Sequence, residues 1–242
     1  MRTIYLDGQY LKVNPQIIKA FTPGVFKAKG VFETMLGING ELIDTDLHFK
    51  RLRAGLKFLG IRLPAINPSV LRQVLRRNHL ICARVRLMVW QEHVMVVALP
   101  YKVSQKAIYR VGLVKTSRPA NKRLADVKSL DYELFAKAYS SARTQGLDEV
   151  LLLNRHGYIF EASRANIFWV KDKVLYTPPL SSGCLNGITR QQVIKQAKDL
   201  KITVKEKNLT PEILKKADGA FITNSLLGIQ SISPVTKPGL RN

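Results

Sequence analysis

Short strands joined in pairs by tight turns are the feature that most restricts the fold of this chain. TIYLDGQYL and GVFETMLGINGELI each place a turn dipeptide, Asp-Gly at 7–8 and Asn-Gly at 39–40, between two strand-like runs. Two more pairs are predicted later, with turns at 155–157 and 171–173. Helices are predicted apart from these pairs. The pattern therefore predicts an α+β protein rather than a doubly wound sheet.

Apolar residues at helical spacing predict the helices. In 44–60, leucines recur at this spacing between an Asp or Thr cap and Gly60, and a second helix opens at Pro68. Three more helices are predicted within 131–146, 191–201 and 210–218, and the last clear predicted strand is GAFITNS at 219–225.

A length of 242 residues allows one large domain or two smaller ones, with a substantial core. The first region reads as two strand pairs, two helices and a further strand pair. We therefore predict a smaller N-terminal α+β domain at 1–101, a linker at 102–106 and a larger C-terminal α+β domain at 107–242.

Several classes of protein are disfavoured by composition. No stretch approaches the ~20 apolar residues of a membrane span, and the first residues lack the apolar region of a secretory signal. Cys82 and Cys184 are too few and too far apart for a disulfide framework or a metal cluster. We expect a cytoplasmic protein with no metal site and no membrane partner.

The formal net charge of +22 raises nucleic-acid binding as a hypothesis. The basic residues are spread along the chain, in segments such as FKAKG, HFKRLR, LRRNHL and KQAKDLK. There is no zinc-finger spacing and no aromatic-basic repeat of an RNA-binding sheet. This distribution favours a solvated basic surface suited to small anions, and no nucleic-acid partner.

Three features suggest chemistry. The first phosphate turn, Gly187–Arg190, leads directly into a predicted helix, whose first N–H groups attract anions. The second phosphate turn, Thr223–Ser225, ends a predicted strand and offers hydroxyl and amide donors. Glu161 lies in a strand, where a buried carboxylate needs a cationic partner such as a protonated ring nitrogen.

Each of these features also has an ordinary interpretation. The first turn can be a simple helix cap, the second a polar loop, and Glu161 a solvent-facing residue. Lys128 is one of many lysines, although a buried lysine can lose its proton and form a Schiff base. Together the features suggest pyridoxal phosphate (PLP) as a cofactor without establishing it.

An ordered series of motifs is more specific than any one of them. GVFETM, HFKRL, ARVRL, VKSLDY, GLDEVLLLN, GYIFEASRANIFWV, YTPPLSSGCLNGITR and FITNSLLGI follow one another along nearly the whole chain. The chain thereby resembles the fold type IV PLP enzymes, or class IV aminotransferases. These include branched-chain and D-amino acid aminotransferases and 4-amino-4-deoxychorismate lyases. The resemblance implies a two-domain, D-amino acid aminotransferase-like fold.

The resemblance also implies roles for matching residues. Lys128 is similar to the lysine that holds PLP as an internal aldimine and acts as a base, and Glu161 to the acid that bonds the pyridine nitrogen. The other implied contacts to PLP are Arg51, Tyr132, Ile188, Thr189, Asn224 and Ser225. Thr34 is a candidate catalytic hydroxyl beside the cofactor, and the candidate substrate contacts are Arg84 and Arg86.

The reaction is expected to run through an aldimine with an amino substrate. TNSLLGI and ARVRLMV are more similar to the lyases, so the favoured activity is that of a 4-amino-4-deoxychorismate lyase, which yields 4-aminobenzoate and pyruvate for folate synthesis. The alternatives are a branched-chain or D-amino acid aminotransferase and, more remotely, a nucleic-acid-binding or catalytically silent relative. The resemblance further implies a homodimer whose PLP is held by both domains of one chain, with most contacts from the larger domain.

The sequence departs from the family pattern in two places. Ala28-Lys29-Gly30 stands where the family usually has Gly-Asp-Gly, and WQEHV replaces an Arg-Gly after the ARVRL strand. The first departure questions the local loop structure, and the second predicts a shortened substrate loop.

Overall fold

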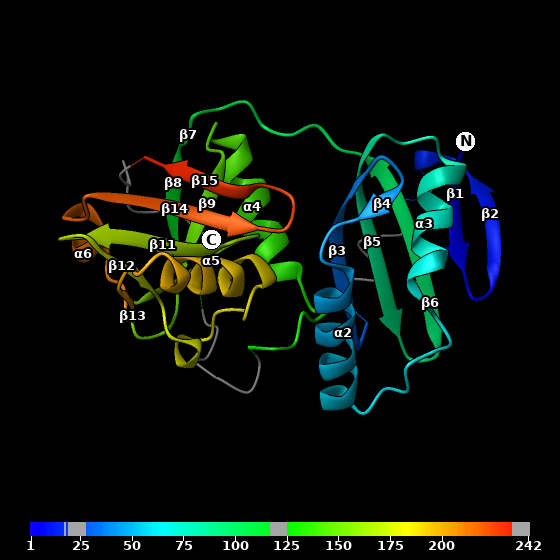
Figure 1. The fold of residues 1–242 in the computed structure, drawn as a ribbon, viewed down its shortest axis with the longest axis horizontal. Helices are drawn as coiled ribbons and strands as arrows, with labels where there is room; N and C mark the ends of the chain where they lie inside the picture. Colours follow the sequence, from blue (N-terminus) through cyan, green and yellow to red (C-terminus); the bar gives the residue numbers. More distant parts are fainter. Residues whose placement is uncertain (17, 19–27, 117–124, 234–242) are drawn as a thin grey trace. The chain divides into compact units, whose positions relative to one another are not determined.

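The computed structural model describes residues 1–16, 18, 28–116 and 125–233. The chain forms two compact units (Figure 1): the first is Met1–Val103 with Asp126–Glu133, and the second is Ser104–Ala125 with Leu134–Asn242. The chain enters the second unit inside the segment predicted as a linker. It then returns to the first unit for Asp126–Glu133, the segment that contains Lys128.

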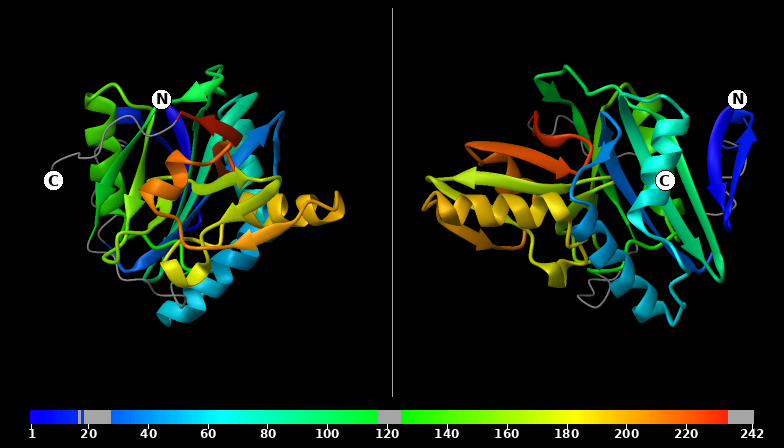
Figure 2. Two further views of the ribbon diagram at one scale, coloured as in Figure 1. Left: turned by 90° about the vertical axis from the view of Figure 1, so that its left-hand side faces the viewer. Right: turned by 45° about the vertical axis from the view of Figure 1, so that its right-hand side comes forward.

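The first unit is a six-stranded antiparallel sheet with two helices on one face (Figures 1 and 2). Its strand order is β2-β1-β6-β5-β3-β4. The strands are β1 (Arg2–Leu6), β2 (Gln9–Val13), β3 (Gly30–Ile38), β4 (Glu41–Leu42), β5 (Cys82–Trp90) and β6 (His93–Pro100), and the helices are α2 (Thr45–Leu59) and α3 (Pro68–Arg77). Alternate residues of β3 face the helices, so the two faces of this sheet carry different clusters.

The returning segment completes the first unit. Phe32 N donates to Lys128 O at 2.9 Å and Leu130 N donates to Gly30 O at 2.9 Å, so this segment lies along β3. Val127 joins the core beneath the helices, and Leu130 joins the core on the opposite face. A Cβ on Gly30 would lie 2.3 Å from Val89 O, which explains why a glycine is needed at the end of the Ala28-Lys29-Gly30 departure.

The second unit contains two sheets (Figure 1), ordered β10-β9-β8 and β13-β12-β11-β14-β15-β7. Its elements are β7 (Ile108–Tyr109), β8 (Val111–Lys115), α4 (Glu133–Thr144), β9 (Glu149–Leu153), β10 (Ile159–Ala162), β11 (Asn166–Lys171), β12 (Val174–Thr177), a 3₁₀ turn (Leu180–Ser182), α5 (Ile188–Asp199), β13 (Val204–Glu206), α6 (Pro211–Lys215), β14 (Gly219–Asn224) and β15 (Gly228–Ile232). One core joins the two sheets, and α5 packs on the other face of the larger sheet.

Most predicted elements are present, and the α+β class is confirmed. The turn residues Asp7 and Asn39 have positive φ angles, of 45° and 50°, as two-residue hairpin loops require. One strand was missed: β15 follows GAFITN, so that segment is not the last strand. Its sequence, GIQSI, is short and half exposed, and lacks a run of branched apolar residues. The predicted strand AIYRVGLVKTS is instead two strands, β7 and β8, in different sheets.

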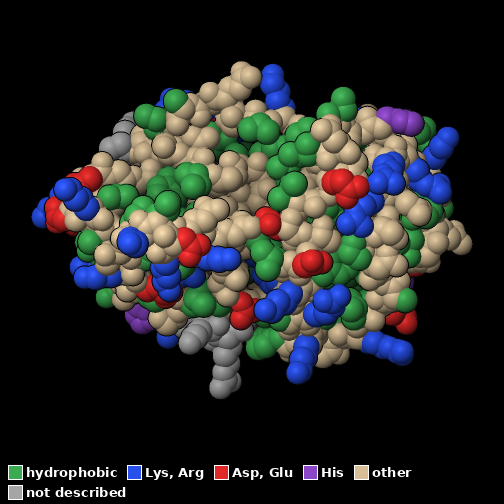
Figure 3. Space-filling model, viewed as in Figure 1, with side chains coloured by type: hydrophobic (Ala, Val, Ile, Leu, Met, Phe, Trp, Pro, Cys, Tyr) green, Lys and Arg blue, Asp and Glu red, His purple; other side chains and the backbone are tan. Residues whose placement is uncertain are grey.

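Basic side chains do not gather into one stripe on the face drawn in Figure 3. They lie there in small groups, with acidic and apolar side chains among them. This agrees with the dispersed basic segments of the sequence. No helix in the described part of the chain is long and apolar enough to cross a membrane.

Candidate functional site

Glu161 in the second unit is a buried carboxylate, only 6% exposed, and not the solvent-facing residue of the ordinary interpretation. It lies on β10, and its Oε2 accepts a hydrogen bond from Leu185 N at 2.9 Å. Burial and then the nearby charge of Glu161 raise the pKa of the Cys184 thiol to about 12. The thiol beside Glu161 is therefore neutral at pH 7.

The first phosphate turn opens α5 as predicted. Gly187 is the N-cap, and no side chain of the described residues caps this helix end. Gly187 O accepts the first bond of the helix, from Gln191 N, so the amides of Ile188 and Thr189 precede the helical hydrogen-bond ladder. Such amides form a binding site for a phosphate.

Asn166, which the sequence analysis missed, lies directly against this turn. Its Nδ2 donates to Leu185 O at 2.7 Å. A Cβ on Gly187 would lie only 2.1 Å from Asn166 Oδ1, so the backbone and this side chain are in close contact. The requirement for glycine in LNGITR thus comes from a residue 21 positions earlier, and no local signal in the sequence reveals it.

In the second phosphate turn, the side chain of Asn224, a predicted contact of PLP, bonds to neighbouring backbone. Asn224 Oδ1 accepts bonds from Leu226 N and Leu227 N, both at 2.9 Å, and its Nδ2 donates to Arg164 O at 3.0 Å. The side chain therefore stabilises the turn itself. The backbone of Asn224 and the half-buried Ser225 stay predicted contacts for a phosphate.

Thr223 adds an unsatisfied hydroxyl to this region. It is 1% exposed, and its Oγ1 has no hydrogen-bond partner among the described residues. Thr223 pairs with Asn166 across β14 and β11, and both therefore point to the face that α5 covers. A buried hydroxyl without a partner near an uncapped helix start fits the binding of a phosphate.

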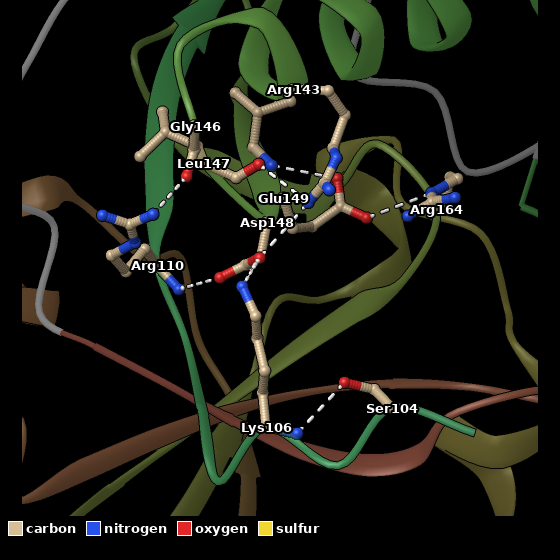
Figure 4. Close-up of polar contacts among 10 residues, drawn as sticks. Ser104, Lys106, Arg110, Arg143, Gly146, Leu147, Asp148, Glu149 and Arg164 are labelled. Atoms are coloured by element: carbon tan, nitrogen blue, oxygen red, sulfur yellow. Dashed lines mark hydrogen bonds and ion pairs between the residues drawn. The ribbon is translucent and has the colours of Figure 1, made fainter. Parts of the chain in front are cut away.

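Glu149, at the start of β9, braces the turn between β10 and β11. Its Oε1 accepts bonds from Val150 N at 2.9 Å and from Ser163 Oγ. Arg164 Nε lies 3.4 Å from its Oε2 (Figure 4). Asp148 binds Lys106 and Arg143 instead. Glu149 therefore anchors the residue two positions after Glu161.

In the first unit, Lys128 and Tyr132 lie together beside Phe32. Lys128 Nζ is 4.7 Å from the centroid of the Phe32 ring and 5.8 Å from that of Tyr132. The two rings meet edge to face, with centroids 5.2 Å apart. The segment 126–133 thus brings the predicted lysine and the predicted tyrosine to one face of the sheet.

The same face carries the predicted Thr34, Arg84 and Arg86. Thr34 is two residues after Phe32 on β3 and lies opposite Arg86 on β5, and Arg84 lies opposite the next residue of that face, Leu36. Arg86 Cζ is 5.5 Å from the Phe32 ring centroid. The first unit therefore places a lysine, a hydroxyl and two arginines along one face.

Arg51 is on the other face, within a buried cluster of charged groups. Its Nε donates to Glu33 Oε1 at 2.8 Å and its Nη2 to Glu33 Oε2 at 2.6 Å, while His48 Nδ1 is 2.7 Å from the same Oε2. Burial acts to raise the pKa of Glu33, but Arg51 and His48 outweigh it and lower that pKa from 4.5 to about 2. The alternation of GVFETM, with Glu33 between the inward-facing Val31 and Met35, is a signal that could have identified this buried carboxylate.

A family model described as amino-transferase class IV matches residues 30–235. The chain is 28% identical to a probable branched-chain-amino-acid aminotransferase of Rickettsia felis, over 96% of this chain and 86% of the relative. It is 29% identical to an aminodeoxychorismate lyase of Bacillus subtilis, over 97% and 86%.

Solved structures of aminotransferases and of a lyase also align with most of the chain. A branched-chain aminotransferase from Thermoproteus uzoniensis, with norvaline, aligns with a TM-score of 0.81 at 27% identity over 97% of this chain and 87% of that one. A putative 4-amino-4-deoxychorismate lyase from Legionella pneumophila aligns with a TM-score of 0.80 at 26% identity, over 88% and 85%. A branched-chain amino acid aminotransferase of T.th. with pyridoxamine 5'-phosphate aligns with a TM-score of 0.79 at 25% identity, over 96% and 85%.

Proposed function

Because the chain belongs to the class IV aminotransferase family, we propose that it acts on an amino substrate as a 4-amino-4-deoxychorismate lyase. The family consists of PLP-dependent enzymes, so the predicted cofactor and the predicted enzyme class are confirmed at that level. The choice of reaction and the role of each residue are our proposal.

In the second unit, Glu161 would hold the pyridine nitrogen and the two phosphate turns would hold the phosphate. PLP, when bound, supplies a protonated ring that withdraws electrons from the substrate Cα. A carboxylate accepts several hydrogen bonds, so Glu161 can accept one from a protonated ring nitrogen together with the bond from Leu185 N. The uncapped start of α5, with Ile188 and Thr189, and the hydroxyls of Thr223 and Ser225 are donors suited to phosphate.

In the first unit, Lys128 would attach the cofactor and then move the Cα proton as a base. The rings of Phe32 and Tyr132 lie against its amine, which limits the positions that Nζ can take. We propose that Arg51 contacts the phosphate. Since Glu33 holds Nε and one N–H of Nη2, that contact would use the other N–H groups of Nη1 and Nη2.

The observation that carries the lyase proposal is the face that bears Thr34, Arg84 and Arg86 with Lys128. Aminodeoxychorismate has two carboxylates, and arginines are suited to bind them. The Thr34 hydroxyl can donate to a leaving oxygen. The second candidate, a branched-chain aminotransferase, is favoured by the similarity to the Rickettsia felis relative over nearly the whole chain.

Product analysis tests the choice. Purified protein with PLP is incubated with aminodeoxychorismate, and separately with branched-chain or D-amino acids plus 2-oxoglutarate. We expect 4-aminobenzoate and pyruvate in the first mixture, and none with the Lys128→Ala variant. Formation of glutamate in the second mixture alone would replace the lyase with an aminotransferase.

The attachment site has its own test. Borohydride reduction of the PLP-loaded protein, followed by peptide mapping, should place the phosphopyridoxyl group on Lys128. Glu161→Gln should still bind PLP but lose turnover by on the order of 10²-fold, because a neutral amide does not stabilise the protonated ring. An adduct on another lysine, or full turnover in Glu161→Gln, contradicts these roles.

We also propose that the protein is a cytoplasmic homodimer, with its activity in folate synthesis. Ile38, Ile43 and Ile81, near one end of the sheet in the first unit, are 40%, 43% and 74% exposed, which supports an apolar contact with a second copy. Two chains at +22 repel each other, an effect that salt partly screens. Light scattering at physiological salt should give the dimer mass, and a monomer with full turnover contradicts the assembly.

A further inference from the structure

We propose that Asn166 is a positioning residue that fixes the spacing between Glu161 and the first phosphate turn. This inference rests on the proposed role of the second unit in holding PLP. It goes further because it makes Asn166 responsible for the preference for PLP over pyridoxal, although its side chain need not touch the cofactor.

Leu185 is the link between the two ends of the proposed site. Its N–H donates to Glu161 Oε2 at 2.9 Å, and its carbonyl accepts from Asn166 Nδ2 at 2.7 Å. Both partners belong to the corner between β10 and β11, Glu161–Asn166, which is closed by a bond of 2.7 Å from Ala162 N to Ala165 O. Leu185 is therefore held through both its N–H and its carbonyl by the corner that joins the two sheets.

The same side chain limits the position of α5. Asn166 is 5% exposed, and its Oδ1 occupies the space that a Cβ on Gly187 would need, at 2.1 Å. The start of α5 is blocked from moving toward the corner, because Gly187 already contacts Asn166 Oδ1. Movement away from the corner is limited by the bond from Asn166 Nδ2 to Leu185 O, two residues before Gly187. Asn166 thus acts on the helix start from both directions.

The corner also holds the second phosphate turn. Asn224 Nδ2 donates to Arg164 O at 3.0 Å, and Thr223 pairs with Asn166 across the sheet. Glu149 in turn anchors Ser163 of the corner, and Arg164 of the corner lies against Glu149 (Figure 4). The donors for a phosphate and the acceptor for a ring nitrogen are therefore attached to one braced corner of the second unit.

This arrangement predicts a selective defect. In Asn166→Ala the start of α5 loses its hydrogen-bonded support, whereas the bond between Glu161 and Leu185 N remains. Loss of the bond to the part-buried Leu185 carbonyl should disturb the local geometry enough to change an affinity by roughly 10-fold. PLP, held at both ends, should lose this factor, and pyridoxal, which has no phosphate, should keep its affinity within about threefold.

Titration of the apoprotein with PLP and with pyridoxal, followed by absorbance, tests the inference. The matched control is Asn78→Ala in the first unit, because Asn78 is also buried and also braces backbone, through Thr3 O and Val74 O. That control should leave the ratio of the two affinities unchanged. Asn166→Ser, whose shorter polar side chain also loses the bond to Leu185 O, should show the same selective loss and provides a second variant if Asn166→Ala folds poorly.

Equal losses for PLP and pyridoxal would mean that Asn166 has a structural role only, and unchanged affinity for both would mean that it has none at this site. Either result overturns the inference while leaving the proposed function intact. A wild-type protein that binds no PLP overturns the proposed function, and this inference with it.

Discussion

Glu33 in the first unit and Glu149 in the second are equally buried, at 1% exposure each, yet burial leaves them in different electrostatic states. Burial raises the pKa of both carboxyl groups. For Glu33 the charges and hydrogen bonds of Arg51 and His48 reverse this effect and lower the pKa to about 2. For Glu149 the opposing effects of Arg164, Ser163 and Val150 N are smaller, and the pKa stays above its ordinary value.

The difference comes from the geometry of one arginine in each unit. Arg51 is itself buried and grips Glu33 with two nitrogens, at 2.8 and 2.6 Å. The side chain of Arg164 is 39% exposed, stacks on the Tyr139 ring, and reaches Glu149 at only 3.4 Å. Burial therefore does not decide the charge of a carboxylate by itself. A buried bidentate partner reverses the effect of burial at Glu33, and Glu149 has no such partner among the described residues.

The largest expected effect is on the first unit. Glu33→Gln should lower its free energy of unfolding by about 3–5 kcal/mol, since Arg51 is left buried without a counter-charge. The fluorescence of Trp90 reports on the first unit and that of Trp169 on the second. Urea unfolding of the Trp169→Phe variant, followed by fluorescence, therefore measures the stability of the first unit. Glu41→Ala, which breaks the exposed pairs with Arg72 and Arg76, is the control and should cost less than about 1 kcal/mol.

A fall in pH should lower the free energy of unfolding through Glu33 and raise it through Glu149. The folded pKa of Glu33 is below its ordinary value of 4.5, so its contribution is present above pH 4.5 and is lost as the pH falls toward 2. The full loss is about 3 kcal/mol, at about 1.4 kcal/mol per pH unit. Glu149, with a raised pKa, contributes stability at low pH and loses it as the pH rises above 4.5.

Urea midpoints measured at about pH 5 and about pH 3, read separately through Trp90 and Trp169, check this sign. The difference between the parent and Glu33→Gln should shrink on acidification. A difference that stays constant would show that Glu33 is not the charged partner of Arg51.

A neutral contact should give the next largest effect, in the second unit. Gly187→Ala forces a Cβ against Asn166 Oδ1 and should destabilise the protein by about 1–3 kcal/mol. Gly219→Ala, where a Cβ meets nothing within 4 Å, is the matched control and should change stability by less than about 0.5 kcal/mol. Thermal unfolding compares the two, and equal changes would argue against the close contact at Gly187.

The smallest effect is expected at Glu149. Glu149→Gln keeps an oxygen for Val150 N and Ser163 Oγ and removes a charge that burial already disfavours. Its free energy of unfolding at pH 7, read through Trp169, should stay within about 1 kcal/mol of the parent. A loss as large as that of Glu33→Gln would remove the contrast between the two units.

Turns and helix ends could be predicted from the sequence, because they depend on residues that are close together in the chain. Asp-Gly and Asn-Gly favour the positive φ angles seen at Asp7 and Asn39, and Thr210, directly before Pro211, caps α6 by accepting a bond from Ile213 N. The start of α5 at Ile188 was likewise visible from Gly187 onward. These features depend on neighbours within a few residues.

Contacts between distant segments could not be predicted in the same way. The pairing of Glu33 with Arg51 joins a strand to a helix, and the contact of Asn166 with Gly187 joins a strand to a loop. Neither leaves a periodic pattern in the sequence. The proposed roles of Lys128 and Glu161 came from the resemblance to a family, because burial and partners cannot be read from spacing.

The return of Asp126–Glu133 to the first unit has a consequence for the order of events during synthesis. Val127 and Leu130 are 5% and 0% exposed, and they complete the cores on the two faces of the first sheet. A nascent chain that ends at Val103 therefore lacks part of its own interior. Domains generally fold as units as they leave the ribosome. We therefore expect the first unit to complete its folding only after the segment that carries Lys128, Asp126–Glu133, has been synthesised.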